Sequence, residues 1–144
     1  MTLSSTGDER DYRRAAELRV SLLRFQRQSE EATWLNDLTP QRYLLLLLIG
    51  LASDAGDPLT VTALREPLQM TQSAVTQLVL GCEAAGLLTR RPRRGDGRSH
   101  DLHLTALGER RVRATFDALG EERARLIEAV GGLTPPVRLI SGPD

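Results

Sequence analysis

The first part of the chain repeats apolar and small side chains with the spacing of an amphipathic helix. Leu18, Leu22, Phe25, Ser29 and Ala32 follow one another at alternating intervals of four and three residues. A helix brings residues at these intervals to one face. We therefore predict a long helix over residues 9–34, with a stripe that packs against another element or another subunit.

The next segment is apolar on all sides. Thr39 has the side chain of an N-cap and Pro40 suits a first helical position, whereas residues 44–49 are five leucines and one isoleucine. Because a helix without a polar face must be covered, we predict a central core helix here. It should end at the loop over residues 53–58, where Asp, Gly and Pro gather.

Two shorter helices are predicted after this loop. The first covers residues 62–68, and a turn at Gln69 and Met70 separates it from a second helix that starts after the N-cap Thr71 and runs to about Ala85. The apolar residues of the second helix share one predicted face: Val75, Leu78, Cys82 and Ala85. The polar residues share the other face: Gln72, Ser73, Thr76 and Gln77. One face is thus expected to pack and the other to contact a partner.

A two-stranded hairpin is predicted after the second helix. Gly86 has the conformational freedom to end the helix. Residues 88–91 then form one strand and residues 101–104 the other, in which Leu102 and Leu104 alternate with polar residues. The Gly-Asp-Gly sequence at 95–97 is expected to form the turn.

These elements define the predicted fold class. A final helix over 106–131 begins after Thr105 and repeats apolar residues at near-heptad intervals, so it should pair with the first helix. The fold class is therefore mainly α (α+β): a winged helix-turn-helix with long N- and C-terminal dimerisation helices at 9–34 and 106–131. The helix-turn-helix and wing occupy 59–105. We expect a single domain over 1–144 that ends in a short tail at 132–144.

Charge changes this picture only through its distribution. All 19 basic residues are arginines and 19 acidic residues balance them, so the net charge of zero indicates no partner. Between positions 90 and 98, however, five arginines surround a single acid, Asp96. The five are Arg90, Arg91, Arg93, Arg94 and Arg98. They form a local positive patch on the hairpin, although such runs can also be merely solvated surface.

A helix and a basic hairpin in this order suit double-stranded DNA. An α-helix fits the major groove, where Gln can pair with adenine and Thr can touch the thymine methyl group. We predict base contacts from the start of the second helix: Thr71, Gln72, Ser73, Thr76 and Gln77. The narrow minor groove attracts guanidinium groups at a hairpin tip, such as Arg94 and Arg98, while Arg91 and Arg93 are expected to bind flanking phosphates.

The terminal helices predict a homodimer. Their apolar seams exceed what one subunit of this length covers, and a two-fold axis would bury them against their symmetry mates. Two recognition helices would then lie about one DNA turn apart, which implies a pseudo-palindromic operator.

The ordered motifs resemble the MarR-type winged helix-turn-helix transcriptional regulators over roughly residues 15–130. The likeness rests on Leu38-Thr39-Pro40-Gln41, on Met70-Thr71-Gln72-Ser73-Ala74-Val75-Thr76 and on Glu83-Ala84-Ala85-Gly86-Leu87-Leu88. The hairpin adds Asp96-Gly97-Arg98-Ser99, then Leu104-Thr105 with Gly108 three residues later. The resemblance implies a dimer built from the terminal helices, an Asp96 that braces the wing and an Arg98 that enters the minor groove.

The same resemblance implies a repressor that is relieved by a small molecule, often an aromatic or phenolic acid held between the lobes. Trp34 and Tyr43 flank the expected cleft, where they would either stack on such an effector or pack in the core.

Several residues depart from the family pattern. Pro67 falls where a helix interior is expected, which risks a kink that costs about 3 kcal/mol, and Arg65 stands where the family usually has Ala. Gln77, Leu80 and Gly81 occupy positions that are commonly Arg, Asp and Arg. These departures leave an alternative open: a winged-helix protein-interaction module with weak or lost operator recognition.

Other functions find little support in the sequence. Cys82 falls on the packed face, so an inert thiol is favoured over a redox switch, and His100 and His103 have no partners at metal-ligand spacing. There is no catalytic grouping or phosphate loop, so we predict neither an enzyme nor a bound cofactor or metal. No apolar run is long enough to cross a bilayer and no signal peptide is evident, so a cytoplasmic protein is expected.

Overall fold

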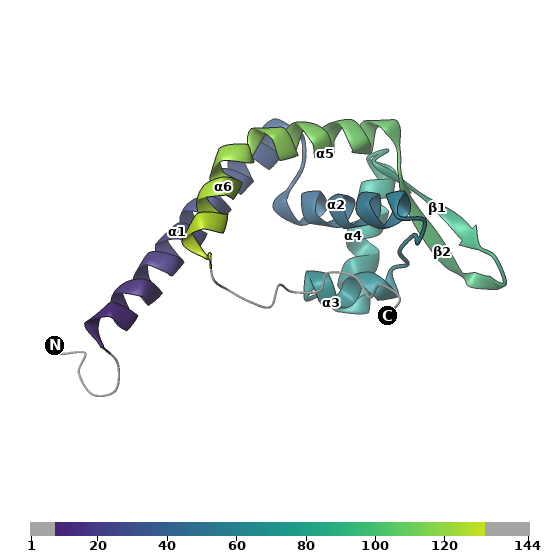
Figure 1. Ribbon diagram of the computed structural model, residues 1–144. Coiled ribbons are helices and arrows are strands. Elements are labelled where there is room, and N and C mark those ends of the chain that lie inside the picture. Colours follow the sequence, from purple (N-terminus) through teal and green to yellow (C-terminus); the bar gives the residue numbers. More distant parts are fainter. Residues whose placement is uncertain (1–7, 132–144) are drawn as a thin grey trace.

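The computed structural model describes residues 8–131, and Figure 1 shows their arrangement. The predicted tail at 132–144 lies outside the described residues. The elements follow the order α1 (Glu9–Leu35), α2 (Pro40–Asp54), the 3₁₀ helix η1 (Thr62–Leu64), α3 (Arg65–Leu68), α4 (Gln72–Ala84), β1 (Leu88–Arg93), β2 (Asp96–Leu104), α5 (Ala106–Ala118) and α6 (Gly120–Ala129). The mainly helical winged fold that the sequence predicts is confirmed.

The central helix α2 begins where its capping residues predict. The Thr39 hydroxyl accepts a hydrogen bond from the Arg42 backbone N–H at 3.2 Å, and Pro40 occupies the first turn. The helix contacts α1, α3, β2 and α5, which together cover most of its apolar surface. This arrangement makes α2 the scaffold to which the helix-turn-helix and the hairpin are attached.

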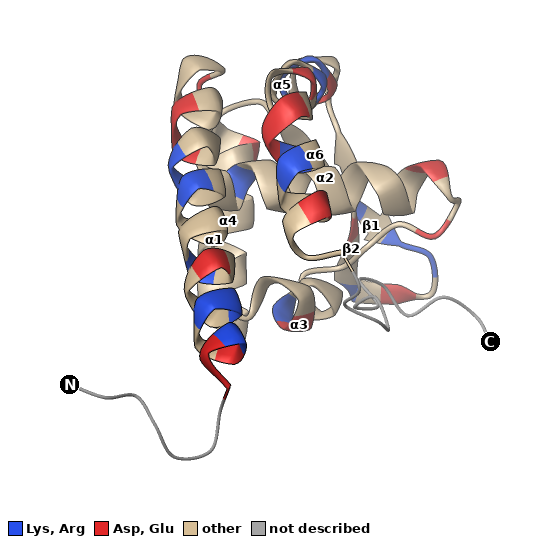
Figure 2. Cartoon of the chain, turned by 60° about the vertical axis from the view of Figure 1, so that its left-hand side comes forward, with Lys and Arg blue, Asp and Glu red and all other residues tan. Residues whose placement is uncertain are grey.

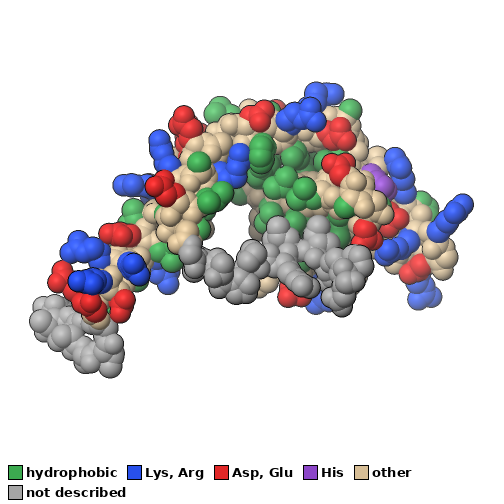
Figure 3. All heavy atoms as spheres, viewed as in Figure 1, with side chains coloured by type: hydrophobic (Ala, Val, Ile, Leu, Met, Phe, Trp, Pro, Cys, Tyr) green, Lys and Arg blue, Asp and Glu red, His purple; other side chains and the backbone are tan. Residues whose placement is uncertain are grey.

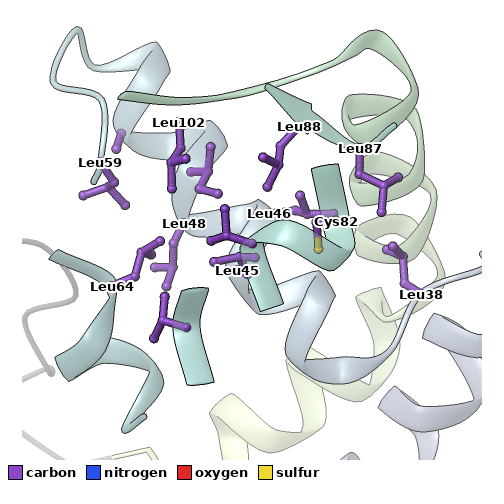
Figure 4. Packing of buried hydrophobic residues seen from close by; sticks show 14 residues of the cluster. Leu38, Leu45, Leu46, Leu48, Leu59, Leu64, Cys82, Leu87, Leu88 and Leu102 are labelled. Atoms are coloured by element: carbon purple, nitrogen blue, oxygen red, sulfur yellow. The ribbon is translucent and has the colours of Figure 1, made fainter. Parts of the chain in front are cut away.

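The core forms around α2. Leu45, Leu46, Leu48 and Ile49 are at most 1% exposed, and residues from η1, α4, the hairpin and the segment before it close over them, as Figure 4 shows. The residues contributed by these other elements include Leu64, Cys82, Leu87, Leu88 and Leu102. Burial of this aliphatic cluster, at about 25 cal/mol per Å² of apolar surface, is what fixes the reading elements relative to one another.

The first helix of the helix-turn-helix differs from the prediction of one continuous helix over 62–68. It is a single 3₁₀ turn followed by the four-residue α3, so Pro67 lies in a first helical turn. An N–H group there has no partner within the helix, and the missing donor of proline therefore costs little. Gln69 ends α3 in the left-handed region with a φ of 54°. The expected penalty at Pro67 thus does not arise.

The helix α4 follows its predicted bounds closely. The Thr71 hydroxyl accepts from the Ala74 N–H at 3.2 Å. At the other end Gly86 has a φ of 75°, and the Leu87 N–H bonds to the Cys82 carbonyl at 2.9 Å, as in a glycine-terminated helix. The predicted packed face is wrong at one position, because Val79 is buried whereas Ala85 is exposed.

The hairpin pairs β1 and β2 antiparallel, with Leu88 opposite Leu104 and Arg91 opposite Asp101. Its turn is shorter than predicted: Arg94 and Gly95 connect the strands, and Asp96 and Gly97 already belong to β2. Gly95 has a φ of 81°, which glycine adopts without strain. The register shifts between Pro92 and Arg93, so the tip is irregular while its base is well paired.

The C-terminal helix is not continuous, contrary to the prediction of one helix over 106–131. It breaks at Leu119 into α5 and α6, and Figure 1 shows the two segments bending over α2 and along α1. Leu119 is 3% exposed, so burying this side chain accompanies the bend. Heptad spacing alone did not locate the break, because the apolar rhythm includes Leu119 and is interrupted only later, at Arg123.

Candidate nucleic-acid interface

The outward face of α4 is polar and uncharged. Thr71, Gln72, Ser73 and Gln77 are exposed and Thr76 is half-buried. The Gln72 amide lies 3.5 Å from the Thr62 hydroxyl, which links the recognition helix to η1. The helix contains no basic residue. It can therefore donate and accept hydrogen bonds but cannot neutralise phosphates.

The five hairpin arginines are not equivalent. Arg90 forms two hydrogen bonds to the Glu83 carboxylate, at 2.9 and 3.1 Å, and thereby ties β1 to the end of α4. This contact lowers the pKa of Glu83 and raises the pKa of Arg90. The Arg93 guanidinium lies 3.6 Å from the Asp101 carboxylate. Arg94 and Arg98, by contrast, are exposed and have no carboxylate within 4.0 Å among residues 8–131.

Asp96 organises the start of β2. Its carboxylate accepts hydrogen bonds from the Arg98 N–H at 3.1 Å and the Ser99 hydroxyl at 2.9 Å. These bonds lower the pKa of Asp96. Because the carboxylate is bonded to its own strand, it fixes the backbone beside the tip, from which the guanidinium of Arg98 extends.

Arg65 is a basic residue near α4 that sequence analysis noted only as a departure from the family pattern. Arg65 lines an open, polar hollow of about 550 Å³, together with Thr62 of η1 and with Gln69 and Thr71 of the turn that precedes α4. Arg65 is exposed and forms no ion pair within the described part of the chain. It is the only basic residue of η1, α3 or α4, so the departure adds a cation at this edge of the reading surface.

A second candidate site lies between the terminal helices and α2. A pocket of about 590 Å³, here called the α1–α2 pocket, is lined by Phe25, Tyr43, Leu44, Phe116 and Arg123, among others. The Arg123 guanidinium lies 3.7 Å from the Phe116 ring centroid and donates to the Phe116 carbonyl at 3.1 Å. Burial raises the pKa of Tyr43, and the nearby Arg123 opposes that effect.

The structure does not bring both predicted effector residues to this pocket. Tyr43 is half-buried and lines it, whereas Trp34 is 75% exposed and does not. The alternative prediction, that Trp34 packs in the core of the subunit, is also wrong, because its side chain is exposed.

Two other residues have environments that the sequence described incompletely. Cys82 is fully buried, as its position on the packed face indicates, and burial raises the pKa of its thiol. His103 is not an ordinary surface residue, because its Nδ1 lies 2.9 Å from the Ser53 hydroxyl. This contact joins the base of the hairpin to the end of α2 across 50 positions of sequence.

Neither a metal centre nor a membrane span is found in the described part of the chain. No group of three or more His, Cys, Asp or Glu side chains is arranged to hold a metal ion within residues 8–131. No helix in the same range combines the length and apolar character needed to cross a membrane.

The order of elements, the polar outer face of α4 and the arginine-bearing hairpin define a winged helix-turn-helix protein. Residues 36–99 match the model of the MarR family. Over these residues the chain is therefore similar to the MarR-type winged helix-turn-helix regulators. This is a family of regulators and not of enzymes. No curated protein matches the chain.

Solved structures share the same fold at low sequence identity. A mutant of MepR from S. aureus bound to an oligodeoxyribonucleotide is 21% identical, with a TM-score of 0.63 over 79% of this chain and 81% of that one. A mutant of MarR from E. coli complexed with operator DNA is 18% identical, with a TM-score of 0.65 over 79% of each chain. MOSR from M. tuberculosis in complex with DNA is 18% identical, with a TM-score of 0.62 over 78% and 79%.

Proposed function

We infer that this protein is a sequence-specific double-stranded DNA-binding transcriptional regulator. The observation that carries this inference is the pairing of an uncharged, hydrogen-bonding face on α4 with two unpaired arginines, Arg94 and Arg98, at the tip of the wing. Structures of similar fold, MepR and MarR, are described as bound to an oligodeoxyribonucleotide and to operator DNA.

In the proposed interface, α4 supplies most of the sequence specificity and the wing supplies most of the affinity. The exposed side chains of α4, above all Gln72 and Gln77, read base edges in the major groove. Arg94 and Arg98 enter the adjacent minor groove, and Arg91 and Arg93 bind its flanking phosphates. Since α4 has no cation, the wing and Arg65 supply the phosphate contacts. Asp101 competes for Arg93, but their separation of 3.6 Å indicates a loose pair.

A homodimer completes the proposed reading unit. The helix α1 buries only Ala32 and Thr33 within the subunit, although it is 27 residues long. Apolar side chains on both terminal helices remain exposed: Val20 and Leu23 on α1 are 48% and 50% exposed, and Ile127 on α6 is 62% exposed. Burial of these side chains against a second copy would place two α4 helices on a pseudo-palindromic operator.

The α1–α2 pocket is the proposed site of a small effector. Its walls include the aromatic residues Phe25, Tyr43 and Phe116, and the charged residues that line it are Arg123 and Glu30. An aromatic or phenolic acid fits this combination, because its ring meets apolar surface and its anionic group meets the guanidinium. A ligand that spans α1, α2 and α6 would bias the spacing of the two α4 helices, and the protein would act as a repressor that the ligand releases from DNA.

One observation favours a second function. Leu80 on α4 is 43% exposed, and an apolar side chain on a reading helix suits a protein contact better than a phosphate. The alternative is therefore a winged-helix interaction module with weak operator recognition.

The two functions are separated by fluorescence anisotropy with the duplex from the protein's own promoter region, titrated at two salt concentrations. The DNA-binding function predicts salt-sensitive binding that Arg94→Ala/Arg98→Ala weakens, with the salt slope falling by about one unit for each lost contact. The control Arg110→Ala/Arg125→Ala removes the same charge from exposed positions on α5 and α6 and should bind like the wild type. Absence of binding at low salt would favour the interaction module.

A further inference from the structure

A second pocket lies at the base of the hairpin, and the proposed function assigns no ligand to it. This wing-base pocket, of about 550 Å³, is formed by α2, β1, β2 and α5. Leu51, Val112 and Phe116 are among its apolar lining residues, and Leu51 and Phe116 are 50% and 43% exposed. Figure 3 shows hydrophobic side chains gathered in the concave surface below α5, toward the hairpin.

The charges around this pocket are balanced and unpaired. Arg91 and Arg113 line it, and so do Asp54 and Glu109. None of the four has an oppositely charged side chain within 4.0 Å in the described part of the chain. Figure 2 shows basic and acidic positions interspersed along the hairpin and the helices beside it. Within residues 8–131, two guanidinium groups and two carboxylates without ion-pair partners therefore border one hollow whose walls are partly polar and partly apolar.

A ligand that complements this pocket needs both signs of charge. A simple organic acid would meet Arg91 and Arg113 but would also face Asp54 and Glu109, and a simple amine would meet the converse mismatch. A small zwitterion can satisfy both sets when its carboxylate and ammonium lie close together and its body is apolar. An apolar α-amino acid has these three features.

We propose that the wing-base pocket binds an apolar L-α-amino acid. Its carboxylate binds Arg91 and Arg113, its ammonium binds Asp54 and Glu109, and its side chain packs on Leu51 and the α5 residues Val112 and Phe116. The site differs from the α1–α2 pocket, which has Arg123 as its cation, although Leu47 and Phe116 line both.

Occupancy of this pocket acts on the wing. Arg91 belongs to β1, the strand that leads to the tip, and it is one of the residues assigned to DNA phosphates. A carboxylate that holds Arg91 withdraws it from the phosphate. The Ser53–His103 contact joins the pocket's α2 wall to β2, so a shift of either wall reaches the hairpin. This consequence rests on the proposed DNA-binding function, whereas binding of the amino acid does not.

The experiment is isothermal titration calorimetry of the full chain without DNA. L-leucine, L-phenylalanine and L-tryptophan are the probes, beside N-acetyl-L-phenylalanine and L-phenylalaninamide, each of which lacks one charge. We expect saturable binding of at least one free amino acid at up to millimolar concentration, with affinity about tenfold weaker for both blocked derivatives.

Variants locate the site. Arg91→Gln and Glu109→Gln should each weaken binding by about tenfold, whereas the surface control Arg110→Gln should not. Unchanged circular dichroism melting would show that each variant is folded. The proposal is overturned by absence of binding to all three amino acids. Equal binding of the N-acetyl derivative, or an equal loss of binding in Arg110→Gln and Arg91→Gln, would also overturn it.

A DNA titration separates this inference from the proposed function. If the promoter duplex binds, saturating amino acid should lower its salt slope by about one unit per subunit. An unchanged salt slope would contradict the proposal that the bound amino acid withdraws Arg91 from a DNA phosphate. If no duplex binds at all, the proposed function fails, and calorimetry still decides whether the pocket binds its ligand.

Discussion

Single residues in this protein determine how closely the reading elements approach the terminal helices. Gly108 is buried in the first turn of α5, where its backbone N–H binds the Thr105 hydroxyl at 3.0 Å. A Cβ atom added at Gly108 would overlap the Leu87 carbonyl oxygen, which belongs to the backbone and cannot rotate away. The Thr105 N–H also bonds to this carbonyl, at 3.1 Å. The contact between α5 and the end of α4 thus requires glycine.

Gly108→Ala should therefore destabilise the fold. Forcing extra volume into a packed site costs about 1–3 kcal/mol. The free energy of unfolding measured with urea should therefore fall by this amount, and the midpoint should move to a lower urea concentration. Gly97→Ala is the matched control, since no atom lies within 4 Å of its added Cβ, and surface changes of this kind stay within about 0.5 kcal/mol. Equal stability of the two variants would contradict the close approach.

The wing shows how an element depends on a local carboxylate. Asp96 bonds to the Arg98 N–H and to the Ser99 hydroxyl, and both bonds favour the ionised form. Its pKa in the folded protein is therefore below that of an ordinary Asp side chain. The stabilisation that follows from this lowered pKa is fully present when the pH is above the pKa of Asp96 in the unfolded chain. It is lost as the pH falls through the pKa of Asp96 in the folded protein. Across neutral pH the wing should keep its turn.

A carbon-detected NMR titration of the side-chain carboxyl should find Asp96 titrating at lower pH than an ordinary aspartate side chain, because its carboxylate accepts two hydrogen bonds. In Ser99→Ala the pKa of Asp96 should rise toward its ordinary value, because one of the two donors is removed. An Asp96 pKa at or above the ordinary Asp value would refute the bracing role.

Elements with local signals were predictable from sequence, and those with long-range causes were not. The caps Thr39, Thr71 and Thr105 each bind an N–H three residues ahead, so residue type and position were sufficient to predict them. The break at Leu119 depends on how α5 and α6 pass over different parts of the molecule, which no heptad pattern contains. The Ser53–His103 contact likewise spans two elements that only the fold brings together.

At the site, sequence predicted the residue types better than their surroundings. The exposed face of α4 lies where the helical spacing of polar and apolar residues predicts it. The arginine run, however, divides into arginines that lie beside carboxylates and arginines that have no such partner within residues 8–131. This division depends on Glu83 at the end of α4 and on Asp101 in the opposite strand. Trp34 lies outside the α1–α2 pocket because its side chain points to the exposed side of α1.

The whole molecule leaves apolar surface that a single subunit does not cover. Leu23 on α1 and Ile127 on α6 are half or more exposed. Figure 1 shows the N-terminal end of α1 projecting from the body, while the rest of the helix contacts α6, α2 and α5. Burial of such side chains in a dimer is favourable at about 25 cal/mol per Å² of apolar surface. Assembly through these helices is therefore part of the proposed function.

Analytical ultracentrifugation should detect a dimer of the wild-type chain and a monomer of Leu23→Glu/Ile127→Glu, because buried charges without partners oppose association. Ala63→Glu introduces the same side chain at an exposed position of η1 and should remain dimeric. A wild-type monomer at micromolar concentration, or a variant as dimeric as the wild type, would contradict assembly through α1 and α6.

The most direct test of the account is the ratio of affinities for a specific and a scrambled duplex. Anisotropy competition should be carried out at near-physiological salt with the wild type and with Gln72→Ala/Gln77→Ala, using the promoter duplex as the specific DNA. The account predicts a wild-type ratio of about 1,000 or more, which the double variant reduces while the salt slope stays the same. A ratio near one, or an unchanged ratio in the variant, would contradict sequence reading by α4.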